Sequence, residues 1–175
     1  MLFIGLLVSI PSFAQFGYDV STDKENGMKV FKGDFTFEDL KNEKTFTWFT
    51  TGAASYKPDS AAMTTLKKHL NKFEIVVLMG TWCDDSHNLV PKLYKVMQQT
   101  GYPADKCKIY GLDRAKEAKG MEHRIYQVTK VPTVIVFQDH IEIGRIVETV
   151  KKSIEEDLAK IIQKRIDEEE KEKGN

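Results

Sequence analysis

Cys83 is the residue of this sequence best placed to do chemistry. It follows an apolar run at 74–79, which predicts a buried strand, and it precedes a segment at 84–99 with helical periodicity. A cysteine at such a junction lies at a helix N-terminus, where backbone N–H groups and the helix dipole favour a thiolate. Because thiolates attack disulfides, we expect Cys83 to be a nucleophile. The alternative is a quiet thiol that takes no part in chemistry.

Ser86 stands where a second cysteine would complete a redox pair with Cys83. A dithiol protein releases its substrate by closing an internal disulfide, and a Cys-x-x-Ser segment cannot close one. The Ser86 hydroxyl could instead donate a hydrogen bond to the sulfur. Cys107 begins the next predicted parallel strand, so it should lie on the order of 15 Å from Cys83. A disulfide needs Cα atoms within about 7 Å, and we therefore expect Cys107 to be a buried structural thiol.

Asp84, Asp85 and His87 are the ionisable neighbours of the thiol. The two aspartates complement the helix N-terminus, but their charge disfavours a nearby thiolate. A protonated His87, one turn along the same helix face, would favour the thiolate. The sequence leaves the net direction open. Alternatively, the aspartates are only helix-start charges and His87 is a solvated helix residue.

The composition is that of a globular protein with an export signal. Of 175 residues, 41% are hydrophobic and 30% charged, and the formal net charge is zero, so nothing overall attracts nucleic acid. An apolar run at 2–10 ends in small residues at 12–14, which predicts a signal peptide over 1–14 and a periplasmic or secreted protein; the alternative is a buried N-terminal strand. The run is too short to span a bilayer, so no membrane span is expected after its removal. No zinc-ligand spacing or phosphate loop is present, and we expect neither a metal nor a cofactor.

The pattern of predicted elements indicates an α/β protein. The expected strands are 28–31, a weak one at 45–48, 74–79, 108–112, 134–137 and 141–147, and the expected helical segments are 36–40, 61–71, 84–99, 115–126 and one that starts at Ser153. This order predicts a mixed central sheet flanked by helices. We divide the chain into an N-terminal extension at 15–58, a domain at 59–166 and a charged tail at 167–175 that frays into solvent.

From about 59 to 163 the chain resembles the thioredoxin-fold family. The features that carry the resemblance are Trp82-Cys83 after the first core strand, Pro91 in the following helix, and Val131-Pro132-Thr133 before a hairpin. The segments 80–86 and 144–148 are also similar to secreted thioredoxin-like proteins of Bacteroidetes-type bacteria. Two departures stand out: Ser86 replaces the second active-site cysteine, and Val77 replaces the buried acid beneath the active site.

The resemblance implies a thioredoxin-like fold and a substrate groove beside the thiol. It implies a cis peptide bond before Pro132, which brings the Val131 backbone beside Cys83, and it makes Thr133 part of the same loop. Trp82 would line this groove; equally, it could be an ordinary packed aromatic.

Three functions are compatible with these residues. The first is a periplasmic monothiol protein that forms mixed disulfides through Cys83 with disulfide- or thiol-containing proteins or with low-molecular-weight thiols. Such a protein performs exchange or isomerase-like shuffling rather than dithiol reduction. The second is a non-catalytic module that binds a peptide in the groove. The third, a peroxidatic thiol enzyme, is the weakest, because no Thr-x-x-Cys pattern or suitably placed arginine supports it.

Overall fold

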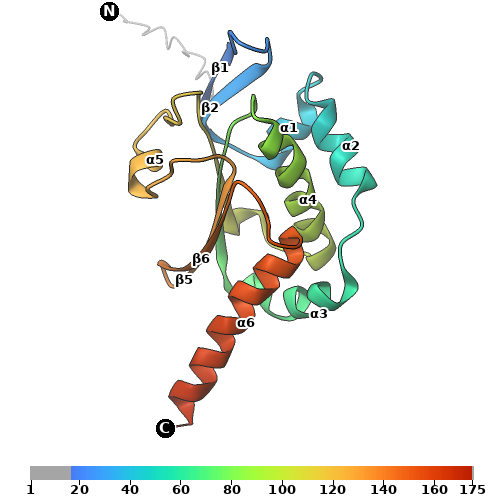
Figure 1. The fold of residues 1–175 in the computed structure, drawn as a ribbon, viewed down its shortest axis with the longest axis vertical. Coiled ribbons are helices and arrows are strands. Elements are labelled where there is room, and N and C mark those ends of the chain that lie inside the picture. The colour runs from blue at the N-terminus through green and yellow to red at the C-terminus, as the bar shows by residue number, and fades with distance from the viewer. Residues whose placement is uncertain (1–16, 175) are drawn as a thin grey trace, which may run out of the picture.

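A six-stranded mixed sheet organises residues 17–174, the part of the chain that the computed structural model describes (Figure 1). The expected signal peptide at 1–14 lies outside these residues. The strands are β1 (Tyr18–Thr22), β2 (Lys29–Phe35), β3 (Glu74–Met79), β4 (Cys107–Gly111), β5 (Thr133–Gln138) and β6 (Ile141–Val147), in the order β1-β2-β4-β3-β5-β6. The helices are α1 (Phe37–Asn42), α2 (Thr47–Ser55), α3 (Ser60–His69), α4 (Asp84–Thr100), α5 (Glu122–Ile125) and α6 (Ile154–Lys173).

Strand β3 is the centre of the sheet, as its continuous apolar sequence predicts. It runs parallel to β4 and antiparallel to β5, and its residues from Ile75 to Met79 are buried. A strand covered on both faces reads as an unbroken apolar run because neither face meets water. The predicted strand at 74–79 and the predicted helix at 84–99 are thus confirmed, together with the α/β class and the mixed, helix-flanked sheet.

The two faces of the sheet are covered very differently. Ile75, Val77 and Met79 belong to the main core, which packs against α1–α4 and α6. Val76 and Leu78 point to the other face, as alternation along a strand requires, and join a smaller core beneath the segment 112–131. Figure 1 shows α5 by itself on this second side. The candidate site lies where the two cores meet, at the carboxyl end of β3.

Two sequence predictions about local structure are wrong. Residues 45–48 do not form a strand, because α2 starts at Thr47 and buries Phe49 in the main core. Residues 115–126 are not one helix: only Glu122–Ile125 is helical, and Lys116 has a positive φ of 63°. Arg114 and Lys116, at the start of this irregular segment, lie over the ring of Trp82. This long-range interaction outweighs the local helical pattern of the sequence.

Both ends of the described chain are more ordered than the sequence suggested. Residues 18–35 form a hairpin, and β2 lies inside the sheet, paired with β4, rather than at its edge. Phe31 and Phe35 from this hairpin are buried in the main core. At the other end, α6 continues to Lys173 instead of fraying from residue 167. Its predicted start is confirmed, since the Ser153 hydroxyl accepts a hydrogen bond from the Glu156 N–H.

Candidate functional site

The Cys83 thiol is half-buried at the N-terminus of α4. Cys83 is the N-cap residue, with extended backbone geometry, and its carbonyl oxygen accepts the His87 N–H at 3.0 Å. Its Sγ donates a hydrogen bond to the Val131 carbonyl oxygen at 3.5 Å. The Val131–Pro132 peptide bond is cis, as predicted. The expected approach of the Val131 backbone to the sulfur is therefore present.

Ser86 supports the loop before the thiol. Its side chain is fully buried, and its Oγ accepts the Gly80 N–H at 3.3 Å. Among residues 17–174, the hydrogen bond of this hydroxyl joins it to the loop and not to the Cys83 sulfur. Because Gly80 is buried, this bond satisfies a backbone donor that has no strand partner. Ser86 is thus a structural residue, and the expected hydrogen bond to sulfur is not formed.

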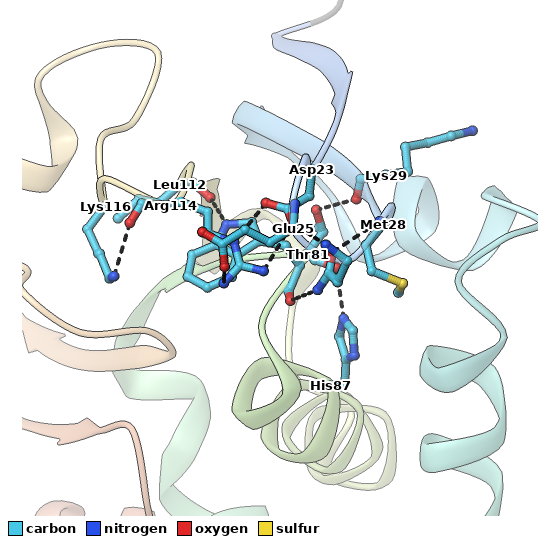
Figure 2. A network of polar contacts seen from close by, with 11 residues as sticks. Asp23, Glu25, Met28, Lys29, Thr81, His87, Leu112, Arg114 and Lys116 are labelled. Atoms are coloured by element: carbon cyan, nitrogen blue, oxygen red, sulfur yellow. Dashed lines mark hydrogen bonds and ion pairs between the residues drawn. The ribbon is translucent and has the colours of Figure 1, made fainter.

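Thr81 attaches the same loop to the N-terminal hairpin. Its fully buried hydroxyl accepts the Phe31 N–H at 3.0 Å and donates to the Lys29 carbonyl oxygen at 2.9 Å. One side chain thus satisfies two backbone groups of β2. Figure 2 shows Thr81 between Lys29 and His87. The loop that carries the thiol is consequently held by β2 from the side.

His87 is turned toward the loop rather than toward the thiol. Its Nε2 lies 2.8 Å from the Thr81 carbonyl oxygen, and because a carbonyl only accepts, Nε2 is the donor. The imidazole stacks on Trp48 with ring centroids 4.2 Å apart. Its Nδ1 is 3.8 Å from Asp84. The interactions shown for His87 within the described chain therefore position the loop. None of them joins its ring to the sulfur.

Trp82 is a packed aromatic. It is buried, and its Nε1 donates to the Leu112 carbonyl oxygen at 2.8 Å. The Arg114 guanidinium lies 4.6 Å from the ring centroid and the Lys116 ammonium 5.5 Å from it. Cations over an indole face are favourable, and here they cover the ring. Of the two expected roles, the structure favours the packed aromatic over an open groove wall.

A cluster of charges beside the thiol was not predicted from the sequence. Arg114 binds Asp23 through two hydrogen bonds of 2.8 and 3.0 Å and pairs with Glu25 at 2.9 Å (Figure 2). The hydrogen bonds from Arg114, together with two backbone N–H groups, lower the pKa of Asp23 to about 2 despite its burial. The hydrogen bond to Asp23 raises the pKa of Arg114, and the negative charges of Asp23 and Glu25 add to this effect.

Asn26 completes the contact between the hairpin turn and the site. Its side-chain amide donates to the Trp82 carbonyl oxygen at 3.0 Å. The only sequence signal for this arrangement is the pair Asn26-Gly27, which is typical of a tight hairpin turn. The partners of this cluster lie far apart in the chain, since Asp23 and Arg114 are 91 positions apart. Local pattern therefore could not reveal it.

The loop before β5 forms the opposite side of the site. Thr133 is buried, and its hydroxyl donates to the Lys130 carbonyl oxygen at 2.7 Å. The Pro132 carbonyl oxygen accepts the Glu148 N–H at 2.7 Å, which ties the loop to the end of β6. Asp84 and Asp85 are exposed, and Asp85 contributes to the raised pKa of Lys130, after the stronger effect of Glu148. Of the predicted residues of this loop, Val131 contacts Cys83, whereas the bonds of Pro132 and Thr133 hold the loop itself in place.

Cys107 lies away from the site. It pairs with Ile75 at the start of β3, whereas Cys83 follows the end of that strand. Both cysteines are free. Burial raises the pKa of the Cys107 thiol to about 12. Its position at the opposite end of β3 from Cys83 agrees with the prediction that Cys107 is a poor partner for Cys83, but Cys107 is half-buried rather than fully buried.

Residues 17–174 contain neither a metal-ligand cluster nor a membrane-spanning helix. No group of three or more His, Cys, Asp or Glu side chains in this part of the chain is arranged to hold a metal ion. No helix within the same residues has the length and apolar character needed to cross a membrane.

Comparison with known proteins supports the fold alone. No family model and no curated protein matches the chain. A crystal structure of a protein of unknown function from Pseudomonas aeruginosa is similar, with a TM-score of 0.56 and 14% identity over 75% of this chain and 93% of that one. An HIV epitope scaffold matches with a TM-score of 0.49 and 14% identity, over 73% of this chain and 82% of the other. The chain therefore shares its mixed α/β architecture with a protein of unknown function.

Proposed function

We propose that this chain is an exported, monothiol thioredoxin-like protein that forms mixed disulfides through Cys83. The observation that carries the proposal is the position of the thiol: half-buried at the start of α4, with Sγ 3.5 Å from the Val131 carbonyl oxygen. The order of strands and helices around that junction supports the thioredoxin-like fold. The apolar run at 2–10 supports export to the periplasm or beyond.

The proposed reaction needs no second cysteine in the chain. The Cys83 thiolate attacks a disulfide, a new bond forms from its sulfur to one sulfur of the substrate, and the other sulfur leaves as a thiolate. An external thiolate then attacks the mixed disulfide and restores Cys83. Ser86 carries a hydroxyl, which cannot form a disulfide, and Cys107 lies at the start of β4, at the opposite end of the sheet from Cys83, so neither residue competes with the external thiol. The partners are disulfide- or thiol-containing proteins or small thiols.

A non-catalytic peptide-binding module is the second candidate. The observation in its favour is the limited access to the thiol, since Trp82 is buried beneath Arg114 and Cys83 is itself only partly exposed. In that case the loop at 131–133 would hold an extended peptide through backbone pairing.

Trapping on non-reducing gels separates the two candidates. Wild type, Cys83→Ala and Cys107→Ala are incubated with periplasmic extract. Mixed disulfides are detected as bands of higher mass that disappear when a reducing thiol is added. Wild type and Cys107→Ala should give these bands, and Cys83→Ala should give none. Ser86→Cys should shorten the life of the trapped species, because a second thiol at this position can release the substrate. Equal trapping by Cys83→Ala would exclude the thiol mechanism and favour the binding module.

A further inference from the structure

A groove runs along the outer edge of β6, on the opposite side of that strand from its partner β5. Strand β6 ends the sheet, and within residues 17–174 no strand pairs with its outer edge. The groove, of about 540 Å³, is bounded by residues 143–147 of β6, the connection at 149–151 and α6. Gly144 allows α6 to approach, because a Cβ at that position would lie 2.8 Å from the Ile161 side chain. The groove is separate from the surroundings of Cys83.

The dimensions and walls of the groove fit an extended chain. Five residues of strand, from 143 to 147, span about 17 Å at roughly 3.4 Å per residue. An unpaired strand edge presents backbone N–H and C=O groups that an added strand can satisfy. Apolar side chains line the groove beside them, among them Ile143, Val150 and Ile161. Val147 is 39% exposed although it is apolar.

The charges that line the groove indicate which kind of peptide it binds. Its lining contains four cations, Arg145, Lys151, Lys160 and Lys164, and one anion, Asp157. Arg145 is paired with Glu142 and Lys164 with Glu168, the latter at 3.7 Å. Among the described residues no ion pair is found for Lys151 or Lys160. Arg145 is also bonded to the Tyr126 carbonyl oxygen, so the excess of positive charge along the edge comes from Lys151 and Lys160 against Asp157, and Lys164 adds a cation that is held only in an exposed pair.

We infer that the β6 edge binds an extended acidic peptide segment of a partner protein, which adds a strand to the sheet. Backbone pairing with residues 143–147 supplies the hydrogen bonds, apolar side chains of the segment contact Ile161 and Val150, and acidic side chains face Lys160 and Lys164. This recognition is independent of Cys83 and does not rest on the proposed thiol chemistry.

The test uses a fluorescent peptide of alternating glutamate and valine, six residues long, and the full chain. Fluorescence anisotropy should show binding that weakens as salt is raised. A peptide with lysine in place of glutamate should not bind, nor should one whose central valine is proline, which cannot pair along a strand. Binding of either control peptide with equal affinity would overturn the inference, and so would absence of binding by the acidic peptide.

Matched variants locate the site. Lys160→Glu with Lys164→Glu should weaken binding by about tenfold or more, because two favourable charge contacts become unfavourable. Lys67→Glu with Lys68→Glu, on α3, makes the same change in net charge and should leave affinity unaltered. Hydrogen exchange should show slower exchange in 143–147 when the acidic peptide is added. Equal loss of peptide affinity in both double variants would overturn the inference. A wild-type dimer that Lys160→Glu with Lys164→Glu converts to a monomer would also overturn it, because a second copy of the chain would then occupy the edge.

Discussion

The two cysteines differ because their surroundings differ. Both thiols are half-buried, but Cys83 lies at a helix N-terminus, whereas desolvation raises the pKa of Cys107 to about 12 from an ordinary value of 9.0. Thiol reagents react with thiolates, so a raised pKa lowers reactivity at neutral pH. The sequence could predict the positions of both cysteines because each stands at a recognisable end of a predicted strand. It could not reveal that Ser86 bonds the Gly80 N–H instead of the sulfur.

Cys107 should therefore react slowly with alkylating reagents in the folded protein. Its ionisation at high pH should destabilise the fold. At pH 8, iodoacetamide should modify Cys83 and leave Cys107 until denaturant is added. Because the folded state holds the Cys107 proton more tightly, the free energy of unfolding should fall as the pH rises from about 9 toward 12. Cys107→Ala should weaken this pH dependence. Rapid labelling of both cysteines in the native state, read by peptide mass, would contradict the expected burial.

Asp23 should contribute to acid stability through Arg114. Its pKa is about 2 in the folded protein, below the ordinary value of 3.8, so its contribution is complete above about pH 4 and is lost as the pH falls toward 2. Arg114→Ala should raise the pKa of Asp23 and shift acid unfolding, followed by circular dichroism, to higher pH. Lys119→Ala removes an exposed ion pair with Asp19 and serves as the control. Identical acid transitions in both variants would refute a special role for Arg114.

At the level of elements, the thiol loop depends on the β1–β2 hairpin. Gly80, Thr81 and Trp82 of the loop form hydrogen bonds with residues outside it, and three of these bonds reach the hairpin. The N-terminal extension expected at 15–58 is consequently part of the site's framework. Its hairpin would fix the direction of α4 and so the position of Cys83.

Thr81→Val tests this dependence. The substitution keeps the shape of the side chain but leaves the buried Phe31 N–H and the Lys29 carbonyl oxygen without their partner, which should cost about 1–3 kcal/mol of unfolding free energy. Hydrogen exchange at the Phe31 amide should become faster. Thr64→Val on the exposed face of α3 should change stability far less. If the two variants unfold at the same urea concentration, the hairpin is not held by Thr81.

Elements with strong local signals were predictable, and those shaped by distant contacts were not. The apolar run of β3, the periodicity of α4 and the capping pair Ser153 and Glu156 each encode their structure locally. The segment 115–126 has helical pattern, yet most of it is irregular because Arg114 and Lys116 pack over Trp82. The residues next to Cys83 in the chain were predicted from the junction between β3 and α4. Asp23 and Asn26, in contrast, come to the site from a hairpin for which the sequence gives only a weak signal.

The whole molecule combines a rigid thiol loop with a sheet edge that is free in the described chain. The loop lies at the carboxyl end of β3, between the hairpin and the loop at 131–133, and the edge of β6 lies beyond β5. A protein with both features could hold a partner segment at one place and exchange a disulfide at another. The two proposed activities can be tested separately, because Lys160 and Lys164 line the groove and Cys83 does not.

Stoichiometric exchange with glutathione disulfide tests the central claim most directly. Wild type and Cys107→Ala are each incubated with the disulfide, and intact mass and peptide mapping locate the adduct. The proposed mechanism predicts one glutathione on Cys83, removed by added dithiothreitol, and none on Cys83→Ala. An unreactive wild type, or an adduct that forms equally well on Cys83→Ala, would contradict the assignment of Cys83 as the exchanging thiol.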